Sequence, residues 1–264
     1  MNCICCKTDD KPIESHIISK FIRNRVTGVG TGKDKKFVFQ WSRGGKPRQD
    51  LQKRKLMCAR CDNEAGSAIE SLVADLLIPS NPSSIAAWEE LPFDYVTVIY
   101  IDIYPLNVGV YEYGNQTFQN GIAAFSLLTA WRALHAIAQD AYPNAVSFLD
   151  SQLGKSIDEA VSRYFHDVHT SRQVKAPPMK AHLYFMGPRS VRNITRANDE
   201  MPFAWALLEK DGVLGIGVAF AYWVVLWPLF DESRNHRAMR ELKKMCFIDW
   251  HAQIHEYFGG AAFV

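Results

Sequence analysis

The chain has 264 residues, of which 48% are apolar, and a formal net charge of +2. This length and composition exclude a disordered protein and suffice for one large or two small buried cores. The small net charge hides an asymmetry: residues 1–61 carry fifteen basic and five acidic side chains, and the remainder carries fifteen and twenty-three. The two parts therefore have net charges of +10 and −8. A basic segment this dense indicates a nucleic-acid partner, and a solvated charged loop is the alternative.

The chain begins with two closely spaced cysteine pairs, Cys3-Ile-Cys-Cys6 and Cys58-Ala-Arg-Cys61. No secretory or transit pattern follows Met1, so we expect a cytoplasmic protein whose thiols stay reduced. Two Cys-x-x-Cys turns present four thiolates, which suits a tetrahedral Zn²⁺ that has no open position for catalysis. The sequence therefore predicts a structural zinc bound by Cys3, Cys6, Cys58 and Cys61, with Cys5 as a spare thiol. A redox dithiol pair is the alternative.

The segment between the two pairs is basic and rich in glycine, with one short strand candidate at 36–41. We expect residues 21–49 to form a long hairpin or flap. A helix should follow at 67–77, because its apolar residues recur at helical spacing. The proline-bracketed run 78–82 is predicted to end this helix and to separate two domains, residues 1–80 and 83–264.

The rest of the chain is predicted to be a mixed α+β domain. A hairpin of strands 95–104 and 108–113 is expected around a turn at 105–107. Three helices are expected, of which the first has only a narrow polar stripe and should be the central core helix. The predicted helices are 121–142, 146–165 and 234–258, and further strands are expected at 182–186 and 203–208.

Residues 213–230 contain no charge and approach the length of a membrane span. The Lys210-Asp211-Gly212 turn before them and the glycines within them favour a buried strand pair. We therefore predict that this segment is not in a membrane.

Several residues between and beside the cysteine pairs carry a resemblance to a known family. Glu14-Ser-His-Ile-Ile-Ser-Lys-Phe21 follows the first pair, and Asp62-Asn63-Glu64 follows the second. This order resembles the zinc-containing HNH, or His-Me finger, endonucleases over about residues 3–77. The resemblance implies a ββα fold in which the second cysteine pair opens the helix.

The resemblance also implies roles for individual residues. It places His16 at the general base and Asp62 or Asn63 at the position that holds a catalytic Mg²⁺ or Mn²⁺. A neutral imidazole can accept a proton from the attacking water, and the cation would neutralise charge on the phosphate. DNA is the expected substrate, in a bacterial or phage-defence setting. The residues expected to hold its backbone are Lys20, Arg23, Arg25, Lys33, Lys35, Lys36, Arg43, Lys46, Arg48, Lys53, Arg54 and Lys55.

A second interpretation keeps the zinc and denies the chemistry. Ser15 and Ser19 stand where the family has an acidic residue and a proline. The chain would then be a nucleic-acid-binding or adaptor protein with a degenerate site. In the nuclease interpretation the acidic domain 83–264 is expected to recognise a partner such as a protein or to regulate access.

Other polar residues are given structural interpretations. Arg132 and His135 lie on the polar stripe of the core helix, where an ionised group needs a partner, so we expect a buried salt bridge. Glu70 could reach the catalytic metal, although surface exposure is favoured. The histidine pairs 166/169 and 251/255 are expected to be at the surface or partly buried, since no third metal ligand is evident beside either pair.

Overall fold

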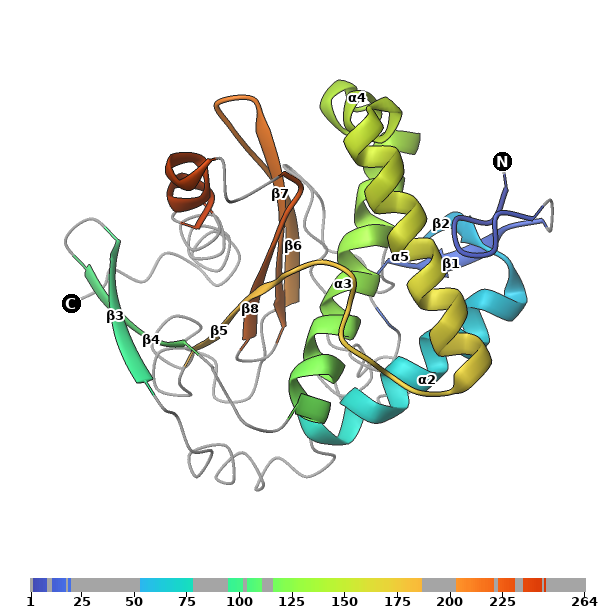
Figure 1. The fold of residues 1–264 in the computed structure, drawn as a ribbon, viewed down its shortest axis with the longest axis horizontal. Coiled ribbons are helices and arrows are strands. Elements are labelled where there is room, and N and C mark those ends of the chain that lie inside the picture. The colour runs from blue at the N-terminus through green and yellow to red at the C-terminus, as the bar shows by residue number, and fades with distance from the viewer. Residues whose placement is uncertain are drawn as a thin grey trace, which may run out of the picture. The chain divides into compact units, whose positions relative to one another are not determined.

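The structure is a computed structural model, and it describes residues 2–8, 11–17, 19, 53–77, 95–101, 104–110, 116–186, 203–220, 223–230, 235–243 and 245. The chain has a mixed α+β fold with antiparallel sheets (Figure 1). It divides into two compact units, which are described one at a time. Unit 1 comprises Met1–Arg25, Gln49–Ile78 and Asn115–Lys180; unit 2 comprises Val26–Arg48, Pro79–Gly114 and Ala181–Val264.

Among its described residues, unit 1 combines a short hairpin with four helices. Strand β1 (Ile13–His16) pairs antiparallel with β2 (Lys53–Met57), and helix α2 (Ala59–Leu77) follows β2 after one residue. Helix α2 packs against the other long helices, and β2 contacts α2 and α3. These further helices are α3 (Gln116–Gln139), α4 (Pro143–Asp150) and α5 (Gln152–Ser171).

Helix α3 is the core of unit 1, as its narrow polar stripe predicted. Every residue from 121 to 136 is buried. One stretch of it, Asn120–Gln139, is long and apolar enough to cross a membrane, and 83% of that stretch is buried inside the fold. A core helix passes the same test of length and composition, so burial against protein explains its apolar character.

The single helix predicted at 146–165 is wrong, because two helices meet at Ser151. This residue is extended (φ −67°, ψ 158°), and its hydroxyl accepts a hydrogen bond from the Gly154 backbone N–H at 2.9 Å. Ser151 is thus the N-cap of α5. A Cβ on Gly154 would lie 1.8 Å from the Phe148 carbonyl oxygen, so only glycine permits this close approach of α4.

Unit 2 is built on a six-stranded sheet in the order β3-β4-β5-β8-β7-β6, in which all neighbours are antiparallel. The segment 213–230 forms β7 and β8, so the predicted strand pair is confirmed, and β7 also pairs with β6 across the Asp211-Gly212 turn. The strands are β3 (Tyr95–Ile101), β4 (Tyr104–Val110), β5 (His182–Met186), β6 (Phe203–Lys210), β7 (Val213–Phe220) and β8 (Trp223–Pro228).

Two further predictions in unit 2 have different outcomes. The turn expected at 105–107 is misplaced, because Ile101 already pairs with Tyr104 and residues 105–107 lie within β4. On the side of β4 that faces β5, only Val108–Val110 are paired. Pro105 lies beyond this paired stretch, so its lack of an N–H costs no hydrogen bond to β5. Residues 236–243 are helical, with Met239 and Leu242 buried as predicted; the end of that predicted helix, 246–258, lies outside the described residues.

The two units do not follow the predicted boundary at residues 80–83. Residues 116–180 were assigned to the second domain, but their helices pack with α2 in unit 1. Helix α3 is apolar around most of its circumference, and a single neighbouring helix cannot bury all of that surface. It therefore packs against α2 as well as against α4. The flap predicted at 21–49 lies outside the described residues.

Candidate metal centre

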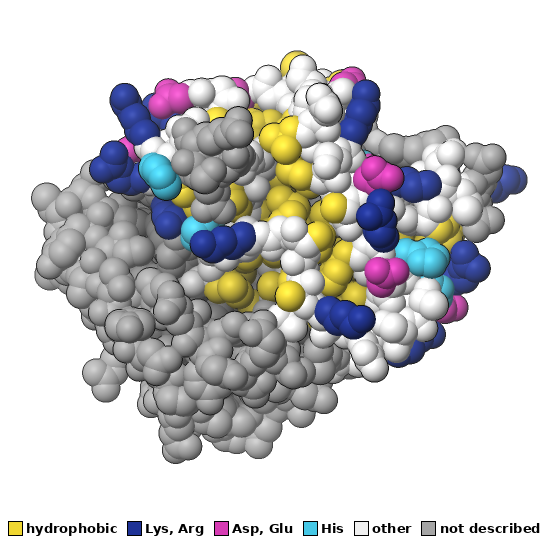
Figure 2. All heavy atoms as spheres, viewed as in Figure 1, with side chains coloured by type: hydrophobic (Ala, Val, Ile, Leu, Met, Phe, Trp, Pro, Cys, Tyr) yellow, Lys and Arg dark blue, Asp and Glu magenta, His cyan; other side chains and the backbone are white. Residues whose placement is uncertain are grey.

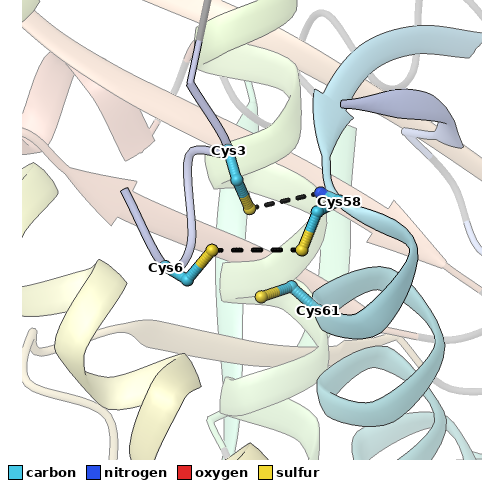
Figure 3. A group of neighbouring side chains, drawn as sticks. All are labelled: Cys3, Cys6, Cys58 and Cys61. Carbon is cyan, nitrogen blue, oxygen red and sulfur yellow. Dashed lines mark hydrogen bonds between the residues drawn. The ribbon is translucent and has the colours of Figure 1, made fainter. Parts of the chain in front are cut away.

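The four predicted cysteines lie together in unit 1 (Figure 3). Cys3 and Cys6 come from the N-terminal turn, Cys58 from the junction of β2 and α2, and Cys61 from the first turn of α2. Their four sulfur atoms all lie within 4.8 Å of one another. The cluster can therefore hold a metal ion such as zinc.

The spacing of the sulfur atoms is close to that of a tetrahedral site. Metal–sulfur bonds of about 2.3 Å place sulfur atoms about 3.8 Å apart at tetrahedral angles. The Sγ atoms of Cys6 and Cys58 are 3.9 Å apart. Burial raises the pKa of Cys3, and the backbone N–H of Cys58, which donates to Cys3 Sγ at 3.2 Å, partly offsets this by stabilising the thiolate that metals bind.

Backbone hydrogen bonds shape the first turn and attach it to the hairpin. The Lys7 N–H donates to the Cys3 carbonyl at 3.0 Å, and Lys7 adopts a left-handed conformation with φ 56°. The Ile4 N–H donates to the Leu56 carbonyl of β2 at 2.9 Å. These bonds bring the first cysteine pair to the second, although more than fifty residues separate them in sequence.

The thiol pKa values differ because the sulfur environments differ. Burial raises the pKa of Cys61, and the neighbouring Cys5 thiol raises it further. Burial also opposes ionisation of Cys6, but hydrogen bonds with Thr8, including one of 2.8 Å between the side chains, lower its pKa to about 7. Metal binding must therefore displace protons, above all from the buried thiols.

Cys5 lies beside the tetrad without belonging to it. It is buried, and burial raises the pKa of its thiol to about 12, so the thiol stays protonated at neutral pH. Its carbonyl accepts a hydrogen bond from the Ser162 hydroxyl of α5. Cys5 thus helps to fasten the first turn to the helices.

Asp158 of α5 makes a second connection between the N-terminal cysteine turn and the helices. Its carboxylate accepts hydrogen bonds from Lys7 Nζ at 2.6 Å and from Trp131 Nε1 at 2.8 Å, and it lies 2.7 Å from His135 Nε2. Burial opposes its charge, but these donors outweigh burial and hold its pKa below the usual range. The acidic partner predicted for His135 is present as Asp158, whereas no sequence pattern indicated Asp158 or its second partner Lys7.

The salt bridge predicted for Arg132 is also present. Arg132 Nη2 donates to Asp62 Oδ1 at 2.6 Å, and the two side chains are 3% and 20% exposed. Asp62 is a predicted ligand of a catalytic cation, and in the structure its Oδ1 atom instead accepts a hydrogen bond from Arg132. Asn63, the other candidate, is exposed on the next position of α2.

The predicted general base lies at the end of the hairpin. His16 is the last residue of β1, is half-buried and is paired with Lys53 in the strand register. The preceding Ser15 is completely buried. Side chains alternate along a strand, so Ser15 points to the interior face and His16 to the other.

Three of the predicted backbone-binding residues lie on β2. Lys55 is exposed, Lys53 is half-buried, and Arg54 makes a bidentate ion pair with Asp140, whose shortest N–O distance is 2.8 Å. On the face shown in Figure 2, Lys and Arg side chains of the described region alternate with Asp and Glu. The other nine, which lie outside the described residues, are Lys20, Arg23, Arg25, Lys33, Lys35, Lys36, Arg43, Lys46 and Arg48.

The histidine pair on α5 has one exposed and one partly buried member. His166 is exposed, and His169 Nδ1 lies 2.8 Å from Glu64 Oε2 of α2. Among the described residues, only the four cysteines form a group of three or more ligand side chains that could hold a metal. The pair 251/255 lies outside the described residues.

Comparison with known proteins adds no identification, because no protein family, curated protein or solved structure matches the chain.

Proposed function

We propose that the chain is a metal-dependent endonuclease of HNH type, stapled by a structural zinc and acting on phosphodiester bonds in DNA. The observation that carries the proposal is the order of elements around the cysteines. An antiparallel hairpin ending its first strand at His16 leads directly into α2, and the cysteine tetrad joins the hairpin to the start of that helix. The family that the sequence resembles places its base and its metal at these positions.

In the proposed reaction His16 accepts a proton from the attacking water. A neutral imidazole is suited to this role near neutral pH. A Mg²⁺ or Mn²⁺ ion supplies Lewis-acid stabilisation of the phosphate when bound. The basic residues between the cysteine pairs hold the nucleic-acid backbone. The part of the chain from residue 83 recognises a partner such as a protein or regulates access.

The test is plasmid cleavage by the zinc-loaded protein in the presence of Mg²⁺ or Mn²⁺. We expect wild type to nick DNA and His16→Ala to lose at least about a hundredfold in rate, the usual contribution of a general base. His166→Ala is the matched control, because this histidine is exposed on α5 and should be dispensable. Equal nicking by wild type and His16→Ala would remove His16 from the mechanism.

The second candidate function is nucleic-acid binding without cleavage. The Asp62–Arg132 pair favours it, because the guanidinium holds an oxygen that a catalytic cation would need. In this case no metal would support nicking, while a gel-shift assay would still detect a complex with DNA or RNA. The affinity should fall steeply with salt, since phosphate contacts release counterions.

A further inference from the structure

One face of α2 beside the cysteine cluster carries two carboxylates with a glycine between them. Asp62, Gly66 and Glu70 follow one another at four-residue intervals, so they share a helix face. A Cβ on Gly66 would lie 3.3 Å from Arg132 Nη2 and 3.6 Å from Glu70 Oε1. The guanidinium and the Glu70 carboxylate therefore flank the space above this glycine.

The two carboxylates differ in their partners. Asp62 has Arg132 at 2.6 Å, whereas no cationic group in the described part of the chain comes within ion-pair distance of Glu70. Burial raises the pKa of Glu70, and the charge of Asp62 raises it further, while Ser19 and Arg132 act in the opposite direction. Glu70 is half-buried and has no ion-pair partner of its own among the residues that the structure describes, and a bound cation would supply that partner.

A buried hydroxyl adjoins the same carboxylate. Ser19 is 2% exposed, lies beside Glu70, and its Oγ makes no hydrogen bond of normal geometry within the described residues. Hydroxyl and carboxylate oxygens are hard ligands, and Mg²⁺ is commonly bound by one or two protein oxygens together with water and phosphate oxygens. Thiolates, by contrast, select zinc.

We propose that Glu70 and Ser19 form a binding site for a divalent cation of the Mg²⁺ or Mn²⁺ type, distinct from the cysteine tetrad. The charge of Arg132 opposes a second cation, but the Asp62 carboxylate matches that charge at 2.6 Å. The inference rests on the proposed function, because it moves the ion of the nuclease from Asp62 or Asn63 to Glu70. Water and a substrate phosphate complete the coordination.

The test is Mn²⁺ titration of the full-length, zinc-loaded protein, with free Mn²⁺ measured by electron paramagnetic resonance. We expect one Mn²⁺ site in wild type. Glu70→Gln keeps the size of the side chain and should weaken binding at least about tenfold, since even outer-shell partners of a metal are worth this much. Ser19→Ala should weaken binding less. Glu159→Gln, at an exposed position of α5, should leave it unchanged.

The circular dichroism spectrum and zinc content of each variant establish that it is folded. Absence of a Mn²⁺ site in wild type, or wild-type affinity in Glu70→Gln, overturns the inference. Mn²⁺ binding that depends on Glu70 without any DNA cleavage supports the site and refutes the nuclease. Metal-dependent cleavage that is unchanged in Glu70→Gln supports the nuclease and overturns the site.

Discussion

Asp62 illustrates how the environment of a carboxylate decides its role. From the sequence it is the first acidic residue after the second cysteine pair, which suits a metal ligand. In the fold, α3 brings Arg132 against it from seventy residues away. The guanidinium also lies 3.5 Å from Met57 Sδ, so it is enclosed by the hairpin as well as by α2. A buried arginine needs this partner, and the pair therefore contributes first to packing.

Replacing Arg132 by Met should destabilise the protein by about 3 kcal/mol, because removal of one partner leaves the Asp62 charge partly buried without compensation. Urea denaturation of the zinc-loaded protein measures the loss. Arg163→Met on α5 is the control, since Arg163 and its partner Glu159 are both exposed and such pairs contribute little. Similar stabilities for the two variants would contradict the role given to Arg132.

At the scale of elements, the junction of α4 and α5 depends on two adjacent features. Ser151→Ala removes the N-cap acceptor and should cost about 1 kcal/mol in unfolding free energy. Gly154→Ala should cost more, because its new Cβ would collide with the Phe148 carbonyl and force the helices apart. Thermal unfolding measures both effects. Ser156→Ala, at an exposed helical position, should be nearly neutral, and a larger loss there than in Ser151→Ala would exclude the cap.

Local sequence patterns predicted which helices and strands form better than they predicted where each begins and ends. Helix α3 is apolar around most of its circumference, and residues 213–230 carry no charge. Both segments must therefore be buried, so a buried helix and a strand pair could be predicted. The break at Ser151 could not, because apolar spacing continues across it, and the Ser151 cap and the close approach of Gly154 to Phe148 become evident only in the fold. The turn near Pro105 was misplaced because proline suits both a turn and the unpaired side of a strand.

In the candidate site, too, only the features that depend on neighbouring residues in the sequence could be predicted. The spacing Cys-x-x-Cys is local and predicts ligands directly, so the tetrad could be found. Asp158, Arg132 and Glu70 acquire their roles from segments that are remote in sequence. Unit 1 is likewise assembled from segments remote in sequence, since the helices of residues 116–171 pack with α2 although a long segment intervenes.

At the scale of unit 1, the metal centre and the helices should respond to each other. Lys7 follows Cys6 and closes the first cysteine turn through its N–H bond to the Cys3 carbonyl. Its side chain also binds Asp158, which in turn binds Trp131. Trp131 stacks on Phe165, with ring centroids 5.2 Å apart, and lies beside His135. Loss of the metal frees the turn, so the hydrogen-bonding partners of the Trp131 indole should change.

Chelation of the zinc should therefore shift the tryptophan fluorescence and lower the unfolding temperature. Restoring Zn²⁺ should reverse both changes. The shift should largely disappear in Trp131→Phe, which identifies the responding indole among seven tryptophans. A full shift in Trp131→Phe, or an unchanged unfolding temperature after complete metal removal, would contradict this coupling.

Asp158 should also make stability depend on pH. Its folded-state pKa is depressed, so its contribution is present above the ordinary aspartate value of about 4 and is lost as the pH falls below that value. The difference in unfolding free energy between wild type and Asp158→Asn should therefore shrink on acidification from pH 5 to about pH 3. Chemical denaturation of both proteins without zinc separates this effect from metal release. A constant difference would show that the carboxylate is not stabilised by its neighbours.

The two cysteine turns enclose a long stretch of chain, and this has a consequence for limited proteolysis. Backbone scission anywhere between residues 19 and 53 would yield two fragments with two sulfur ligands each. Bound zinc would keep the fragments associated through gel filtration under native conditions, and a chelator would release the shorter one. A metal ion in the cysteine cluster would thus act as a reversible cross-link whose strength depends on metal supply.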